Sequence, residues 1–400
     1  MRVQTLIRQN RDLRIDFFRG FALWCMLIDH MIKSWLRGIT LKEYGFCDGA
    51  ELFVLLSGIS AGIVYHRAMV RDGLGPAWLK IARRIVAIYR THLILFMLFV
   101  AEVGFLVAWL NPPSFLEFLT LDKFSAHPFR GIWNAVLLGR DEPKFFDILP
   151  LYIVLLSLLV LTLPLIRWSR LLLGGSVLLY VAARVFSLNL GPWTDTWFFN
   201  PLAWQVIFMI GVTSPYILKA RDYWRGWDWL AVLFSLFSLF ESHAKHLKGH
   251  VPAALLIHFE VDKPAVHPFR LLAIVSLGWL AWRYIPATAH WLRSRWAGPL
   301  VLLGQHSLGV FASSILISVF GEAILFTHPG WISQILVQGV GTVALVAVAA
   351  VTAWNSNKNR PDGRATTVSG TGSAVKRPPL LVAEGQEIVT NFNNARADVN

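Results

Sequence analysis

The chain has 400 residues, of which 55% are apolar or aromatic types and only 15% are charged, and its mean hydropathy is +0.53. Soluble domains carry roughly 25% charged residues, so this composition excludes a soluble fold, a disordered chain, a collagen and a small disulfide scaffold. The net charge of +13 does not indicate nucleic-acid binding, because the basic residues are spread over short loops between apolar runs. Basic loops are ordinary on one side of a membrane protein.

Ten apolar runs approach the roughly 20 residues that cross a bilayer. They cover residues 17–36, 50–66, 85–110, 145–166, 171–188, 200–218, 228–243, 269–286, 299–321 and 331–354. We therefore predict an all-α, polytopic integral membrane protein with three regions: a cytoplasmic N-terminal segment (1–16), a bundle of about ten transmembrane helices (17–354) and a tail (355–400). The tail is polar and is expected to be disordered. The apolar stretch 251–259 is too short to cross and is expected to be re-entrant or interfacial.

The distribution of lysine and arginine predicts the orientation. With the N-terminus inside, the cytoplasmic segments hold 17 of these residues and the opposite segments hold 11, before the tail is counted. This bias places both termini in the cytoplasm. The opposite face then carries the two longest loops, 111–144 and 244–268, and loops commonly carry function.

Ionisable residues in the first span are the strongest candidates for chemistry, since they are costly within a bilayer. Arg19 and His30 are eleven residues apart, which places them on one helix face and about 16 Å apart along the axis. A neutral His30 is suited to act as a general base on a hydroxyl. Asp16 is predicted as a second catalytic residue. In the alternative interpretation, Asp16 and Arg19 pair at the interface and His30 makes an interhelical hydrogen bond.

The next two spans add small residues and deep arginines. The second span contains Ser57, Gly58, Ala61 and Gly62, a spacing that permits close helix contact. In the third span, Arg84 is followed six residues later by Arg90, about 9 Å deeper along the helix. Such arginines are able to hold phosphates through bidentate contacts, or to anchor the helix at the interface.

Together these segments resemble the acyltransferase 3 superfamily, and most closely its OpgC branch, which succinylates osmoregulated periplasmic glucans. The similarity rests on an ordered set of motifs within about residues 11–354: Arg19-x10-His30, RDLRIDFFRG (11–20), GAELFV (49–54), the arginine-rich third span, FDILPLY (146–152), NPLAWQ (200–205) and LGQHSLGVF (303–311). The third span departs from the superfamily pattern, because a short Arg-x-x-Arg spacing is replaced by Arg84-x5-Arg90.

The resemblance implies an O-acyltransferase of the bacterial inner membrane. It implies that an acyl group, with succinyl-CoA as the expected donor, passes from cytoplasmic acyl-CoA to a periplasmic glucan. The catalytic histidine of the superfamily corresponds to His30, and its arginines correspond to Arg19, Arg84 and Arg90, which are expected to bind the CoA phosphates. The expected partners are the glucan and the lipid bilayer, with no nucleic acid and no metal; a homo-oligomer is compatible with the sequence.

Further residues are weaker candidates. Asp147, Asn200, Trp204, Gln205 and Lys263 are predicted to contact the sugar substrate. Each has a structural alternative: Asp147, Asn200, Trp204 and Gln205 lie at the ends of spans and are suited to cap or anchor helices, and Lys263 is suited to a solvated positive face.

His306 is predicted to touch the nucleotide or else to fix helix packing. Two other functions stay open at this point. The first is a transporter or flippase for a glycan or a lipid-linked sugar, since intramembrane charges and broken helices suit transporters as well. The second is a structural partner in a glucan-export complex.

Overall fold

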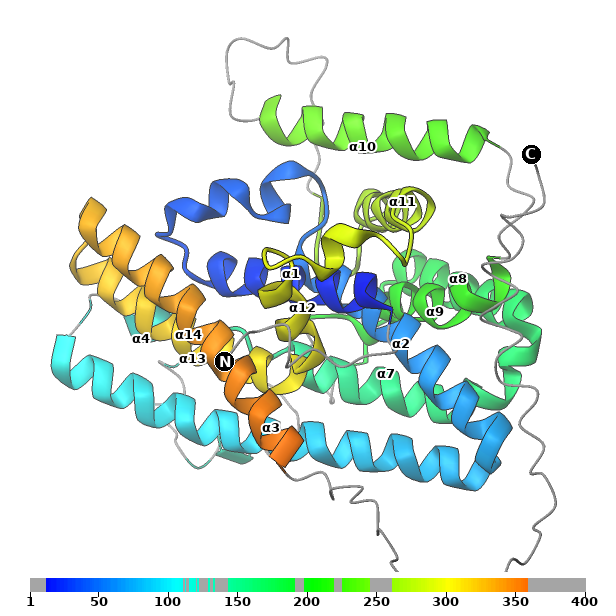
Figure 1. Cartoon of the computed structure of the whole chain (residues 1–400), viewed down its shortest axis with the longest axis horizontal. Helices are drawn as coiled ribbons and strands as arrows, with labels where there is room; N and C mark the ends of the chain where they lie inside the picture. Colours follow the sequence, from blue (N-terminus) through cyan, green and yellow to red (C-terminus); the bar gives the residue numbers. More distant parts are fainter. Residues whose placement is uncertain are drawn as a thin grey trace, which may run out of the picture.

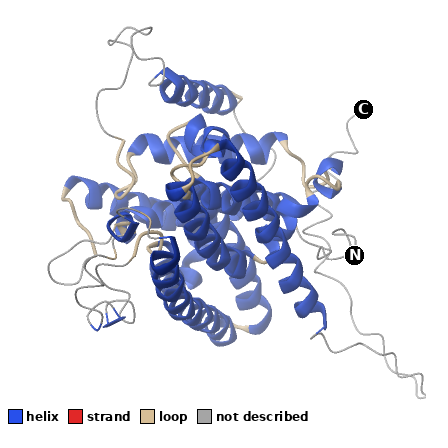
Figure 2. Ribbon diagram, turned by 90° about the vertical axis from the view of Figure 1, so that its left-hand side faces the viewer, coloured by secondary structure: helices blue, strands red, loops and turns tan. Residues whose placement is uncertain are grey.

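The computed structural model describes residues 12–110, 143–190, 198–218, 225–244 and 261–358, with short pieces at 112, 115–119, 121, 129 and 132–133. This part of the chain folds into helices joined by loops and contains no strand (Figures 1 and 2). The predicted all-α class is therefore confirmed for the described residues. The tail beyond 358, the stretch 251–259 and most of the loop 111–142 lie outside them.

The α-helices follow one another along the chain with few long interruptions. They are α1 (Leu13–His30), α2 (Gly49–Asp72), α3 (Leu74–Leu110), α4 (Phe115–Phe118), α7 (Ile148–Thr162), α8 (Ser169–Val185), α9 (Pro201–Ile217), α10 (Gly226–Ala244), α11 (Pro268–Tyr284), α12 (Gly298–Gln305), α13 (Ser307–Thr327) and α14 (Trp331–Lys358). Four 3₁₀ turns link them: η2 (Trp35–Ile39), η3 (Leu41–Tyr44), η4 (Leu163–Trp168) and η6 (His290–Arg293).

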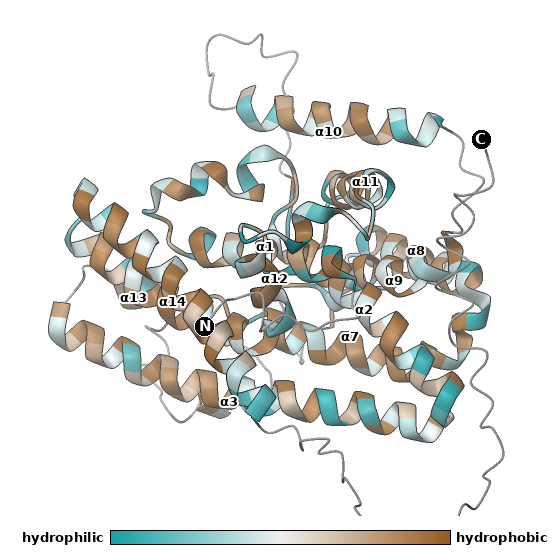
Figure 3. Cartoon of the chain, viewed as in Figure 1, coloured by the Kyte–Doolittle hydropathy of each residue, from teal (hydrophilic) through white to brown (hydrophobic). Residues whose placement is uncertain are grey.

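Five helical segments of the described part are long and apolar enough to cross a membrane: α2, α3, the continuous run from α7 to α8, α13 and α14. In the most apolar windows of α3 and α14, only 28% and 22% of the residues are buried in the protein, and much of both helices is coloured as hydrophobic in Figure 3, with some hydrophilic positions on α3. Since such surfaces require an apolar solvent, these helices identify a membrane protein. Each predicted span contains helix, but the count of ten crossings stays a prediction.

Several predicted boundaries differ from the observed helices, and three of the differences have a local cause. The span predicted over 17–36 ends at His30, because the chain turns at Met31 and continues in η2. The span predicted from residue 85 begins at Leu74, directly after Gly73 ends α2 with φ +90°. The span predicted over 299–321 is divided at His306, whose φ of −114° and ψ of 33° separate α12 from α13.

Helix α1 lies at the centre of the bundle, in contact with α2, α12 and α13 (Figure 1). Its crossing with α12 is very close: a Cβ atom built on Gly20 would lie 1.8 Å from the carbonyl oxygen of Leu300, and one on Gly304 would lie 1.8 Å from that of Asp16. No side chain fits at either position. The two glycines therefore fix how near the polar face of α1 lies to α12.

The crossing of α2 with α9 uses the small residues that the sequence indicated. A Cβ atom on Gly58 would lie 2.1 Å from the carbonyl oxygen of Phe208, and one on Gly211 would lie 2.3 Å from that of Leu55. The prediction of tight helix contact along the second span is confirmed. The outlying helix is α10, which packs on α11 and η3 at the top of Figure 1.

Candidate active site at the end of helix α1

The His30 side chain ends α1 and is half-buried at the junction of several helix ends. Its ring lies nearly parallel to that of Phe145, with 4.1 Å between the ring centroids and 29° between the planes. Among the described residues, its Nδ1 atom is buried and has no hydrogen-bond partner. A buried polar atom without a partner is rare and costly, so this imidazole retains a hydrogen-bonding capacity that a ligand could use.

Phe145 adopts a strained backbone conformation to reach this position. Its φ is +80°, which is unusual for a bulky residue. Strain of this kind persists where the surrounding structure imposes it, and it is frequent at functional sites. Here the surroundings are Phe118, whose ring lies 6.4 Å from that of Phe145, and the His30 ring itself. The turn before α7 thus holds an aromatic ring against the candidate base.

A network of buried ion pairs joins the start of α2 to the start of α11, near the His30 end of α1. Asp48 and Glu51 form a capping box at the start of α2, in which the Glu51 carboxylate accepts from the backbone N–H of Asp48 at 3.0 Å. Arg270, in the first turn of α11, donates from Nε to Glu51 Oε1 at 2.6 Å, and its Nη2 lies 3.2 Å from Asp48 Oδ2. Lys263 Nζ lies 2.7 Å from that same oxygen. Four charges from three parts of the chain therefore neutralise one another here.

This network determines the ionisation of Asp48. Burial by itself would raise the pKa of that carboxyl, but the Lys263 and Arg270 cations outweigh it and hold the pKa well below its usual range. Asp147, just before α7, has no such ion pair among the described residues, and burial raises its pKa to about 6, which Lys263 lowers only in part. Lys263 therefore lies within electrostatic range of both predicted site residues, Asp147 and His30.

The charged groups that act on His30 are three lysines and one aspartate: Lys263, Asp48, Lys144 and Lys42. The sequence had indicated only Lys263 of this group as a ligand residue. The capping pattern Asp48-x-x-Glu51 is readable in the sequence, but its cationic partners are more than 200 residues away. Three of these four groups are cations, and one of them, Lys263, is paired with Asp48.

The other end of α1 is arranged differently. Asp16 and Arg19 are both buried, at 1% and 6% exposure, and Arg19 Nη1 lies 3.9 Å from Asp16 Oδ1. Arg19 also donates to the carbonyl oxygen of Leu56, at 2.9 Å, and to the hydroxyl of Ser60 on α2. Gln305 of α12 donates to Asp16 at 3.2 Å. These contacts match the structural alternative for the Asp16–Arg19 pair.

The remaining predicted CoA ligands lie outside α1, the helix that carries Arg19. Arg84 is half-buried on α3 and lies within electrostatic range of Tyr65 on α2. Arg90 is exposed on α3. His306 is buried at the joint of α12 and α13, where its backbone oxygen accepts from Val310 at 3.1 Å.

The predicted sugar-binding residues of α9 have partners within the protein. Asn200 caps α9 by accepting from Leu202 N–H at 3.0 Å, and its amide donates to Leu188 at 2.6 Å. Trp204 is fully buried and donates from Nε1 to the carbonyl oxygen of Pro264 at 3.1 Å. Contacts of this kind fix helix ends, as the structural alternative requires.

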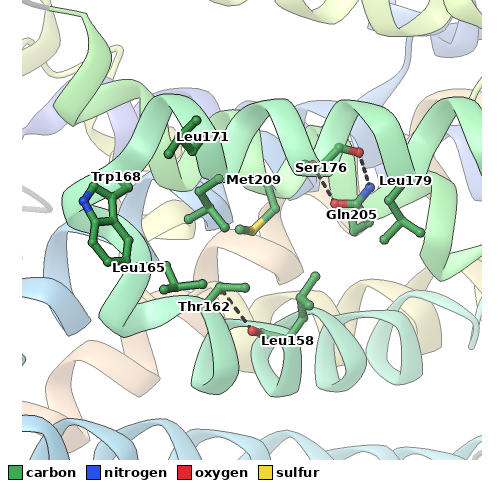
Figure 4. A pocket seen from close by; sticks show the side chains of 11 residues that line it. Leu158, Thr162, Leu165, Trp168, Leu171, Ser176, Leu179, Gln205 and Met209 are labelled. Carbon is green, nitrogen blue, oxygen red and sulfur yellow. Dashed lines mark hydrogen bonds between the residues drawn. The ribbon is translucent and has the colours of Figure 1, made fainter.

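Gln205, one residue after Trp204, ties α9 to α8. Its Oε1 accepts from the Ser176 hydroxyl at 2.6 Å, and its Nε2 donates to the Ser176 carbonyl at 2.8 Å. The pair borders an open cavity of about 350 Å³ between α7, α8 and α9, whose other lining residues include Leu158, Trp168 and Met209 (Figure 4). Since its lining is almost entirely apolar, this cavity is suited to hydrocarbon and not to a sugar.

Comparison with known proteins supports a family assignment. Neither the curated proteins nor the solved structures gave a match. The family model described as "OpgC protein" matches residues 11–357, a range that begins just before α1 and ends with α14. It therefore includes His30 and every other residue of the site described above. Because the match covers most of the chain, the protein belongs to the OpgC family.

Proposed function

We propose that this protein transfers an acyl group from acyl-CoA to a hydroxyl of a periplasmic glucan, with His30 as the general base. OpgC membership implies a transferase; acyl-CoA as the donor and the glucan hydroxyl as the acceptor belong to the proposal. The observation that supports it best is the His30 imidazole, half-buried, held by Phe145, and with a buried Nδ1 that lacks a partner in the described structure. We take succinyl as the acyl group.

The proposed step balances as an ordinary acyl transfer. The His30 imidazole takes the proton of the acceptor hydroxyl while its oxygen forms a bond to the thioester carbonyl carbon. The bond from this carbon to the CoA sulfur breaks, and the thiolate recovers the proton from the imidazolium. Such a base contributes roughly 10²–10⁴-fold to rate. Phe145 and the neutralised network around Asp48 support the base in position.

The donor would approach from the opposite end of α1. Arg84 and Arg90 lie on α3 with their guanidinium groups at least partly accessible, so they are suited to the CoA phosphates through the planar geometry of arginine. Arg19 lies about 16 Å from His30 by the helical rise, which is comparable with an extended pantetheine arm. It contacts Leu56 and Ser60 on α2 and Asp16 on α1, and in this proposal it also contacts a CoA phosphate.

The direct test is acyl transfer by the purified full-length protein in detergent or nanodiscs. Supplied with succinyl-CoA and a glucan oligosaccharide, it should release thiol and raise the mass of the glucan by one succinyl group per event. Mass spectrometry of periplasmic glycans from cells with and without the gene gives the same answer in vivo. If glucan crosses proteoliposome membranes while no thiol is released, the protein is a transporter and the proposal fails.

A further inference from the structure

Two cations near this end of the bundle, Lys263 and Arg270, are already paired with carboxylates. Lys263 is paired with Asp48 at 2.7 Å, and Arg270 is shared between Asp48 and Glu51. The predicted role of Lys263 as a substrate ligand would therefore require an existing ion pair to break. A cation without a carboxylate partner can bind an anion beside His30 without first breaking an ion pair.

Lys144 is such a cation. It precedes Phe145 in the turn before α7 and is half-buried. Its Nζ lies 4.0 Å from the ring centroid of Phe118 and 5.9 Å from that of Phe145, an arrangement in which aromatic faces hold the ammonium in place. No carboxylate among the described residues lies within ion-pair distance of it. Glu322 acts on it only at longer range, and that carboxylate accepts from the backbone N–H of Lys33 at 3.2 Å.

The ammonium also lies at a useful distance from the base. Lys144 Nζ is 5.9 Å from the Phe145 ring, which is 4.1 Å from the His30 ring, so the ammonium is at most about 10 Å from the imidazole. In a four-carbon dicarboxylic acyl group, three C–C bonds of about 1.5 Å place the far carboxylate roughly 4 Å from the reacting carbon. One hydrogen bond of about 2.8 Å joins this carboxylate to the ammonium, and another joins the imidazole to the acceptor oxygen that attacks the reacting carbon. A bent donor therefore fits within this upper limit.

Partial burial lowers the pKa of the Lys144 ammonium. A bound carboxylate would stabilise the charged form of Lys144. Both the charge and the distance therefore favour the binding of a carboxylate here.

We propose that Lys144 binds the free carboxylate at the far end of a dicarboxylic acyl group and so selects this donor over an uncharged one. This inference rests on the proposed acyl transfer at His30 and adds to it the residue that determines donor specificity. The same carboxylate chemistry could come from an acidic acceptor, so the test must separate a carboxylate on the donor from one on the acceptor.

The test compares succinyl-CoA with butyryl-CoA, which has the same four carbons but no carboxylate, at a fixed concentration of one neutral glucan acceptor. The measured quantity is the ratio of kcat/KM for the two donors. Because a hydrogen bond to a charged group is lost, Lys144→Met should lower this ratio by about 10- to 100-fold. Lys144→Arg keeps the charge and should retain most of the preference.

Lys33→Met is the matched control. Lys33 Nζ also lies over an aromatic ring, that of Phe326 at 5.3 Å, whereas Lys144 lies near the ring of Phe145 that stacks on His30. Its removal should leave the donor ratio unchanged. If Lys144→Met folds poorly, the thermal shifts produced by succinyl-CoA and butyryl-CoA in Lys144→Gln report the same selectivity, since ligand binding raises the melting temperature.

Three results would overturn the proposal. An unchanged ratio in Lys144→Met or Lys144→Gln shows that Lys144 does not contact the acyl carboxylate. A loss of kcat/KM that is equal for both donors, and so leaves their ratio unchanged, assigns Lys144 to the acceptor site or to loop structure. If the wild type releases thiol from neither donor, the proposed function itself fails, and this outcome is distinct from an active enzyme without donor preference.

Discussion

The two ends of helix α1 carry the residues that the sequence singled out, and they differ in one physical respect. At the Arg19 end, the guanidinium and the Asp16 carboxylate are buried among protein partners, beneath a glycine contact with α12. At the His30 end, a ring nitrogen is buried without a partner in the described structure, and Lys144 nearby lacks a carboxylate. Satisfied polar groups indicate a structural role, whereas a buried group without a partner requires another explanation, such as a ligand.

The sharpest test of this comparison is His30→Ala. Because a general base contributes roughly 10²–10⁴-fold, acyl transfer should fall by that factor while the protein inserts and melts nearly as the wild type does. His328→Ala, at the exposed C-terminal end of α13, is the matched control and should retain full turnover. Near-normal turnover in His30→Ala would assign the histidine to packing and would remove the difference between the two ends.

At the opposite end, Gly304→Ala should damage the fold and not the chemistry alone. Its Cβ would lie 1.8 Å from the Asp16 carbonyl oxygen, so α1 and α12 must separate, at a cost of about 3 kcal/mol or more. We expect a large fall in melting temperature or loss of the monodisperse protein. Gly339→Ala on α14, where a Cβ meets nothing within 4 Å, should be neutral or slightly stabilising. A normal melting temperature for Gly304→Ala would contradict the close crossing.

Arg19→Lys and Asp16→Asn separate structure from binding at the same end. If Arg19 is a structural link to α2, both variants should lose comparable stability, on the order of 1–3 kcal/mol. CoA should then raise the melting temperature of Arg19→Lys as much as that of the wild type, at concentrations near the wild-type Kd. A normally melting Arg19→Lys that no longer responds to CoA would instead make Arg19 a phosphate ligand.

The smallest expected effect is the pH dependence of Asp147→Asn. Burial raises the pKa of Asp147 to about 6 in the folded protein, above an unfolded value of about 3.9. Between these values the folded state binds more protons, so the wild type loses stability as the pH rises from about 4 to 6. Asp147→Asn should therefore be the more stable protein above pH 6 and should lose this advantage near pH 4. The measurement is the difference in melting temperature between Asp147→Asn and the wild type at pH 4.5 and at pH 7.5. An equal difference at both pH values would contradict the raised pKa.

Local sequence was enough to identify the helices of the described part and the close packing of the second span. Hydrophobic runs and small residues act within a few turns of one helix, so Gly58 and Gly62 could be interpreted without knowing that Phe208 and Val212 face them. His30 stood out for the same reason, because an ionisable side chain in an apolar run is costly wherever its partners lie.

Only the tertiary structure decided which polar groups have a hydrogen-bond or ion-pair partner within the protein. Arg270 meets Glu51 across 219 positions of sequence and Gln305 meets Asp16 across 289, and no local pattern specifies such pairs. The same packing ends α1 at His30 and leaves Lys144 near it without an ion-pair partner among the described residues. Sequence determines the apolar character of each helix because hydrophobicity is a property of single residues, whereas a hydrogen bond or ion pair needs two residues that only the fold brings together.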